Sequence, residues 1–300
     1  MNKLKTIVNK IKKHKISYLF IAPYVLLFLV FTVLPVVVSM VLSLTSFNGM
    51  EMPQFIGLDN YFRLFFKDPL FIKGVQNTVM LAIILGPGGY LFSLISAWFI
   101  NELSPKVRSV VTLLFYAPSI SGNAYLIWSV MFSGDDYGYI NSMLIRLGLI
   151  VEPIQFLQNT TYILPIVIIV SLWTSLGTGF LSLIAAFQGV DRAYYEAGAL
   201  DGIKNRWQEL WYITIPILKP QMTFSAIMSI TGAFGVGAVI TTLCGYPTTD
   251  NVGHTIMNHL TDYGGGRYEL GYASAIAVVL FFMMIFSNLF AKKFIASIGK

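Results

Sequence analysis

Six long apolar stretches, separated by shorter polar segments, follow one another along the chain. Each is long enough to cross a hydrocarbon core, which takes about 20 helical residues. The first lacks a small-residue cleavage site and exceeds the apolar core of a signal peptide, so we expect it to remain uncleaved. The pattern predicts an all-α, polytopic membrane protein with six transmembrane helices, at 16–44, 77–100, 107–132, 162–187, 222–243 and 270–291.

The composition and the charge distribution add an orientation. Hydrophobic residues make up 56% of the 300 and charged residues 11%, well below the roughly 25% of soluble domains. Of the 20 Lys and Arg residues, 15 fall on the side that holds both chain ends. Because basic residues accumulate on the cytoplasmic side, we expect cytoplasmic termini in the cell membrane, including a basic segment 1–15. The segments 45–76, 133–161 and 244–269 are then extracellular.

Several chemistries lack their usual signals. The phosphate-binding pattern Gly-x4-Gly-Lys-Ser/Thr does not occur, so any ATP hydrolysis is expected in a separate polypeptide. An intramembrane enzyme would show paired Asp, His or Ser-Lys groups within the spans, and none is present, so we expect that this chain is not an enzyme. No Lys, Arg, Asp or Glu lies well inside a predicted span, which disfavours an ion-coupled carrier. Hydroxyls and carbonyls can also bind Na⁺, so a secondary active carrier for a neutral solute, not driven by ATP, stays open as the alternative. We expect no metal site, and we expect His254 and His259 to be solvated.

A polar segment, 188–221, separates the fourth and fifth predicted spans, and we call it the elbow. An aspartate that suits an N-cap begins a predicted short helix at 191–199. Asp201 and Gly202 form a turn dipeptide, and Asp201 can also cap a second, amphipathic helix at 203–213. The pattern predicts a helix–glycine–helix unit on the cytoplasmic side.

The elbow resembles the EAA loop of ABC importer permeases. The family pattern is Glu-Ala-Ala, three residues, Gly, nine residues, Ile, one residue and Leu-Pro. This sequence has Gly198 for the second Ala, Ile215 for Leu and ten residues before Ile213, and the extra residue is expected in the second short helix. The resemblance implies that the elbow couples to an ATPase through Glu196, Ala197, Gly198, Asp201, Gly202, Ile213 and Pro216.

Flanking motifs, among them Leu19-Phe-Ile-Ala-Pro23, Asn77-Thr78 and Gly271-Tyr-Ala-Ser-Ala275, are similar to those of maltose-type (MalF/UgpA-like) carbohydrate permeases. The resemblance implies the type I importer fold, with a MetI-like transmembrane core over 77–291 and a cytoplasmic end at 292–300. It implies a permease subunit that translocates a sugar or oligosaccharide delivered by an extracytoplasmic solute-binding protein.

The same resemblance implies the partners. They are a second, homologous permease subunit in a heterodimer, a cytoplasmic ABC ATPase dimer, the solute-binding protein and the lipid bilayer, with no nucleic acid. This chain is expected to hold no cofactor, because ATP and Mg²⁺ belong to the ATPase.

Hydroxyl side chains share one face of the fourth predicted span, at i, i+3, i+4, i+7 and i+11. Such a face can pack closely against another helix or line a route for a polyol, and we favour the route. In the fifth span, Ser225, Ser229 and Gly232 form a shorter stripe, for which we favour packing. The candidate pathway residues are Ser171, Thr174, Ser175, Thr178, Ser182, Ser229 and Gly232.

Overall fold

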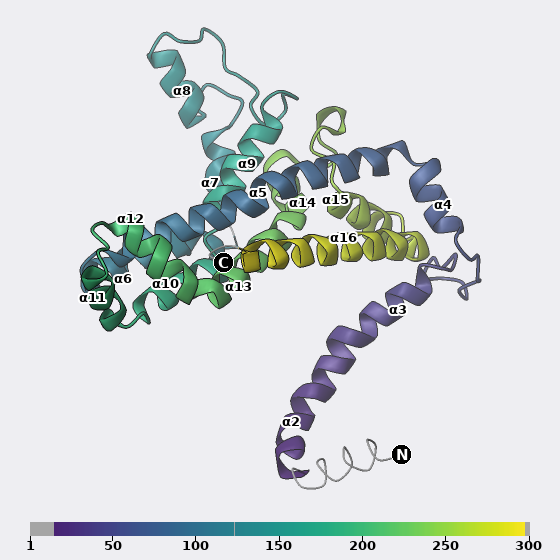
Figure 1. Ribbon diagram of the computed structural model, residues 1–300. Coiled ribbons are helices and arrows are strands. Elements are labelled where there is room, and N and C mark those ends of the chain that lie inside the picture. The colour runs from purple at the N-terminus through teal and green to yellow at the C-terminus, as the bar shows by residue number, and fades with distance from the viewer. Residues whose placement is uncertain (1–14, 123, 298–300) are drawn as a thin grey trace. The chain divides into compact units, whose positions relative to one another are not determined.

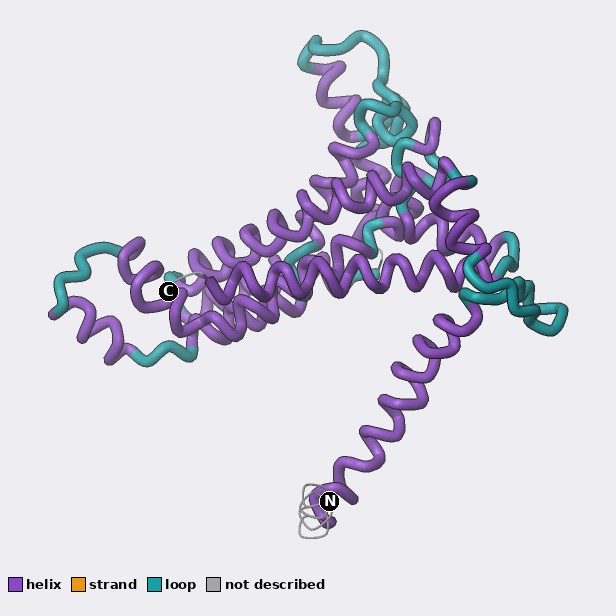
Figure 2. Tube along the Cα trace, turned by 45° about the vertical axis from the view of Figure 1, so that its right-hand side comes forward, coloured by secondary structure: helices purple, strands orange, loops and turns teal. Residues whose placement is uncertain are grey.

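The computed structural model describes residues 15–122 and 124–297 (Figures 1 and 2). In this part of the chain the secondary structure is helical, with an isolated bridge between Thr45 and Phe55 and no strand. The all-α fold class is therefore confirmed. The basic residues at 1–14 and Lys300, on which the charge asymmetry partly depends, lie outside the described residues.

Three helical runs of the described chain are each long and apolar enough to cross a membrane. The first consists of α2 (Lys15–Phe28), the π-helical turn η1 (Leu29–Val33) and α3 (Leu34–Leu42). The second is α5 (Pro69–Asn101), which has 33 residues and is about 50 Å long at 1.5 Å per residue. The third is α16 (Leu270–Ser297).

The other three apolar stretches are bent pairs of helices, so that up to six spans result if each pair counts as one. The pairs are α6 (Pro105–Ile120) with α7 (Ala124–Met131), α9 (Ile163–Thr174) with α10 (Thr178–Gln188), and the run Arg206–Phe234 with α14 (Gly237–Cys244). The second and third of these pairs are bent by 41° and 48°. Shorter helices are α4 (Asp59–Phe66), α8 (Tyr139–Arg146), α11 (Arg192–Leu200), η3 (Thr249–Asn251), α15 (Ile256–Thr261) and η4 (Asp262–Gly266).

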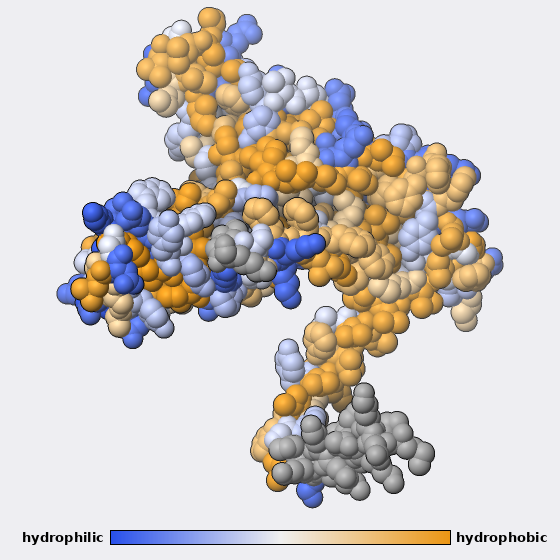
Figure 3. All heavy atoms as spheres, viewed as in Figure 1, coloured by the Kyte–Doolittle hydropathy of each residue, from blue (hydrophilic) through white to orange (hydrophobic). Residues whose placement is uncertain are grey.

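The chain divides into two compact units, and the described part of the first comprises 15–63 and Asp262–Val278. Its helical run Lys15–Leu42 leaves its apolar side chains exposed, as the orange surface in Figure 3 shows. Such a surface suits lipid or another apolar helix. Elsewhere in this unit, Arg63 pairs with Glu269 and lies 4.0 Å from the ring centroid of Tyr272. The hydrogen bond to Glu269 raises the pKa of the Arg63 guanidinium.

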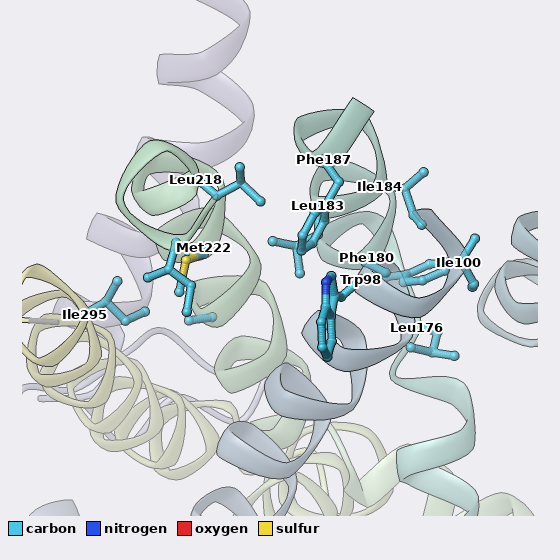
Figure 4. Close-up of a cluster of buried hydrophobic side chains, with 13 residues drawn as sticks. Trp98, Ile100, Leu176, Phe180, Leu183, Ile184, Phe187, Leu218, Met222 and Ile295 are labelled. Atoms are coloured by element: carbon cyan, nitrogen blue, oxygen red, sulfur yellow. The ribbon is translucent and has the colours of Figure 1, made fainter. Parts of the chain in front are cut away.

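The second unit, Leu64–Thr261 with the end of α16, has its core where α5, α10 and α13 (Ile215–Phe234) pack together. Figure 4 shows Trp98 and Ile100 of α5 with Phe180 and Leu183 of α10 in this buried cluster. Small residues allow the close approach of membrane helices. A Cβ at Gly179 would lie 2.9 Å from Ser225 Oγ and 3.0 Å from its Cα. Ser225 therefore packs against α10, as expected.

The expectation of solvated histidines is wrong. His254 and His259 are only 2% and 1% exposed, and His254 Nε2 lies 3.0 Å from His259 Nδ1. His259 Nε2 lies 3.2 Å from a carboxylate oxygen of Asp68, which also caps α5 by accepting from the Phe71 N–H. The segment folds back onto α5, where Asn77 donates to the carbonyls of Val252 and His254. Side chains distant in sequence thus bury both rings.

Candidate functional site: the elbow and a hydroxyl-lined cavity

The first helix of the elbow, α11, is capped at both ends. Asp191 Oδ1 accepts from the Ala193 N–H at 3.0 Å, which confirms the predicted N-cap. At the other end, the Ile203 N–H donates to Gly198 O at 3.0 Å and the Gly202 N–H to Ala199 O at 3.3 Å. These two bonds define a Schellman motif, which requires a left-handed residue at its turn. Gly202 supplies it with a φ of +91°.

The two limbs of the elbow, α11 and the chain after Gly202, pack against each other at Gly198 of α11. Gly198 is buried, and a Cβ there would lie 2.6 Å from Ile213 Cδ1 and 3.1 Å from Ile203 Cδ1. The absence of a side chain therefore lets both isoleucines rest on the helix backbone. Glu196 and Ala197, by contrast, are exposed. Of the three residues in the Glu-Ala-Gly motif, two face outward and Gly198 packs inside the elbow.

The second limb differs from the predicted separate helix at 203–213. Its cap is Asn205, whose side chain accepts from the Gln208 N–H at 2.9 Å, whereas Asp201 is the C-cap of α11. The prediction that Asp201 caps this helix is thus wrong, because five residues, 201–205, separate α11 from α12 and Asn205 stands directly before the second helix. The limb starts as α12 (Arg206–Glu209) and continues without a break into α13.

A π-helical turn, η2 (Leu210–Thr214), joins α12 to α13. Its Ile215 N–H donates to Leu210 O, five residues back. Such a wide turn holds one residue more than an α-helical turn. The extra residue that separates this elbow from the family pattern can therefore be accommodated here. Ile213, within the π turn, then lies against Gly198, and Pro216 stands in the first turn of α13.

A cavity of about 790 Å³ lies between the elbow and the turn from α5 to α6. Arg206 lines it and bonds to Glu209 at 2.6 Å and to Glu102 at 3.2 Å. Beside this ion pair, the rings of Trp98 and Trp207 meet at 4.6 Å between centroids. The elbow is therefore tied to the end of α5 by a charged and an aromatic contact. Figure 3 shows hydrophilic residues gathered over this end of the unit.

A second cavity, of about 410 Å³, lies among the helices of the second unit. Six of the seven candidate pathway residues line this cavity, and these six come from α9 or its C-cap, from α10 and from α13. Ser182 lies further along α10 and is not among them. The six are Ser171, Thr174, Ser175, Thr178, Ser229 and Gly232.

Three hydroxyl residues that line this cavity were not predicted from the sequence. Tyr116 and Ser119 come from α6, and Tyr125 comes from α7. The available signal was Pro118, which stands inside the third apolar stretch beside Ser119. A proline in a membrane helix leaves a backbone carbonyl that polar neighbours can satisfy, so it often marks a polar part of a span. The proton of Ser119 Oγ goes to Tyr116 O at 2.8 Å.

Comparison with known proteins decides the family. Residues 89–300 match the sequence profile of the family described as "Binding-protein-dependent transport system inner membrane component". The chain belongs to this family. It is a multi-pass membrane permease, the transport component rather than a catalyst.

Relatives of this permease support the assignment over most of its length. It is 32% identical over 275 residues to the probable ABC transporter permease protein YesP of Bacillus subtilis (strain 168), covering 90% of this chain and 86% of the relative. It is 35% identical over 218 residues to the lactose transport system permease protein LacF of Rhizobium radiobacter, covering 72% of each chain.

Solved structures resemble the permease closely. A chain from the crystal structure of a bacterial ABC transporter that imports the acidic polysaccharide alginate superposes with a TM-score of 0.77 and 26% identity, covering 98% of this chain and 100% of that one. A second, from the alginate transporter in complex with its alginate pentasaccharide-bound periplasmic protein, gives 0.76 and 25%, covering 94% of each. The fold is therefore that of an ABC importer permease.

Among the described residues, no group of three or more His, Cys, Asp or Glu is placed to hold a metal ion.

Proposed function

We propose that this permease carries a sugar or oligosaccharide inward, as a subunit of an ATP-binding-cassette importer loaded by an extracytoplasmic solute-binding protein. One observation carries the proposal. The helix α10 starts at the hydroxyl-lined cavity, with Thr178, and ends at Gln188, three residues before the cap of α11. The candidate cargo site and the candidate coupling site are thus the two ends of a single short helix.

The helix α10 is a suitable mechanical link. Its 11 residues span about 16 Å, and it packs against both α5 and α13. A displacement of the elbow moves α10 as a rigid rod and so moves Thr178 and Gly179 at the cavity. The limb after Gly202 runs without a break into α13, which carries Ser229 and Gly232. Both limbs of the elbow therefore lead to the cavity.

The remaining partners follow from the exposed surface of α11. Glu196 and Ala197 face outward for contact with a cytoplasmic ATPase dimer, which binds ATP and Mg²⁺. Gly198, Gly202 and Ile213 keep the two limbs in register during that contact. The exposed apolar run Lys15–Leu42 suits lipid and a second, homologous permease. Both chain ends and the elbow are assigned to the cytoplasm, in accordance with the basic residues of that side.

The experiment is uptake into proteoliposomes that contain the complete importer. Labelled lactose, arabino-oligosaccharides and maltotriose are offered with the binding protein, and either ATP or an ion gradient is supplied. We expect uptake of at least one sugar only with ATP inside the compartment that faces the elbow. Uptake driven by an ion gradient without ATP would show the secondary carrier instead. The matched control is the importer with the ATPase omitted, in which uptake should stop.

A further inference from the structure

The lining of the hydroxyl-lined cavity carries no formal charge. Its polar groups are hydroxyls and backbone, contributed by serines, threonines and two tyrosines, and the charged side chains of the described chain lie elsewhere. A carboxylate moved into such a site loses its hydration without gaining a cation. In the membrane interior that loss is large. The lining therefore discriminates by charge.

The hydrogen bonds of the lining sharpen this discrimination. A hydroxyl has one proton to donate and two lone pairs that accept. Ser175 Oγ donates its proton to Leu172 O at 2.7 Å, and Ser119 Oγ donates to Tyr116 O at 2.8 Å. Thr174 Oγ1 donates to the carbonyls of α9, at 3.2 Å. Three of the eight cavity hydroxyls thus use their proton on the backbone and present lone pairs to the cargo, whereas the other five, of Tyr116, Tyr125, Ser171, Thr178 and Ser229, can donate as well as accept.

The lone pairs of Ser119, Thr174 and Ser175 favour donors on the cargo. A sugar hydroxyl can donate to each of them, whereas an ionised carboxylate has no proton to donate and is repelled. From this geometry we infer that the cavity admits a neutral sugar or oligosaccharide and rejects an acidic one. The inference rests on the proposed function and specifies its substrate class. Relatives differ in this respect, since one carries lactose, which is uncharged, and another imports alginate, an acidic polysaccharide.

The test bypasses the binding protein, which would otherwise select the sugar first. Ser229→Cys in a Cys244→Ser background places a single thiol at the cavity. The complete transporter is purified with its partner permease and ATPase, and thiol alkylation by a small maleimide is timed. Three neutral trimers, of galactose, arabinose and glucose, are compared with trimers of galacturonate and of alginate. Thr242→Cys, exposed on α14 and outside the cavity, is the matched control.

We expect at least one neutral trimer to slow alkylation of the Ser229→Cys thiol at least tenfold at saturation. The acidic trimers should change it by less than twofold, and the Thr242→Cys thiol should respond to none. Equal or better protection by an acidic trimer would overturn the inference while leaving the proposed function intact. Protection by no trimer would also overturn it, because the cavity would then not be a sugar site. Failure of ATP-driven uptake in proteoliposomes is a separate result that removes the proposed function itself.

A gain of charge provides the second variant. Gly232 lines the cavity, and a Cβ there meets no atom within 4 Å, so a longer side chain has room. Gly232→Lys adds a cation, and Gly232→Gln adds a similar length without charge. In the Ser229→Cys reporter, we expect the lysine variant to need at least tenfold less acidic trimer for half-protection than the glutamine variant. Equal values in the two variants would contradict control by the charge of the lining.

Discussion

The glycine at the turn of the elbow offers the sharpest single perturbation. Gly202 has a φ of +91°, and a Cβ there would meet nothing within 4 Å. A substitution to Val is therefore opposed by the backbone conformation alone and not by a clash. A non-glycine residue in such a region costs about 1–3 kcal/mol. At about 1.4 kcal/mol per tenfold, the ratio of closed to open Schellman turn falls by roughly a factor of 5 to 150.

The consequence should be confined to coupling. Gly202→Val removes no apolar contact from the helices that form the core, so the permease should still insert and assemble with its partner. The ratio of closed to open Gly198–Ile203 bonds at the end of α11 should fall by the same factor. We expect the ATPase to co-purify with the permease at least fivefold less well. Stimulation of its activity by the loaded binding protein should fall by a similar factor.

Two variants control this experiment. Gly202→Asn should retain more coupling than the valine variant, because Asn enters the left-handed region more readily than a β-branched residue. Gly189→Ala changes the glycine at the end of α10, where φ is −84° and an added Cβ makes ordinary contacts, so it should behave as wild type. Wild-type co-purification and wild-type stimulation in Gly202→Val would refute the role of the turn.

Three further predictions follow from the orientation, the cavity and the ion pair. Single cysteines introduced at Glu51 and at Lys204, both exposed, should differ in their labelling by an impermeant thiol reagent in sealed right-side-out cells. We expect the reagent to label the cysteine at 51 and not the one at 204, and labelling at 204 would reverse the orientation. Ser175→Leu should lower sugar uptake at least tenfold, because the leucine fills the cavity and removes a hydrogen-bond acceptor. Assembly and basal ATP hydrolysis should stay intact, and lost assembly would show a packing role instead. Arg206→Glu should lower uptake no more than about fivefold, since exposed ion pairs contribute about 1 kcal/mol or less, and Glu102→Arg should restore it in the double variant; no restoration would argue against the pair.

The sequence by itself determined the features that depend on neighbouring residues. Helices close their hydrogen bonds locally, so the six apolar stretches and the N-cap of α11 could be predicted from composition and spacing. The hydroxyl stripe from Ser171 to Thr178 was visible for the same reason, because residues three and four apart share a helix face. Motifs in the elbow added the family of the protein, which periodicity alone does not provide.

Only the tertiary structure decided the features that join distant segments. His254 and His259 are buried because α5 covers them from more than 170 positions away, and no local pattern signals this. The inward packing of Gly198 depends on a π turn that brings Ile213 onto it. The separation of Ser175, at the cavity, from Ser225, between helices, depends on which helix faces each one. Whether a hydroxyl is solvated, packed or available to cargo is set by its neighbours in space, and those neighbours are chosen by the fold.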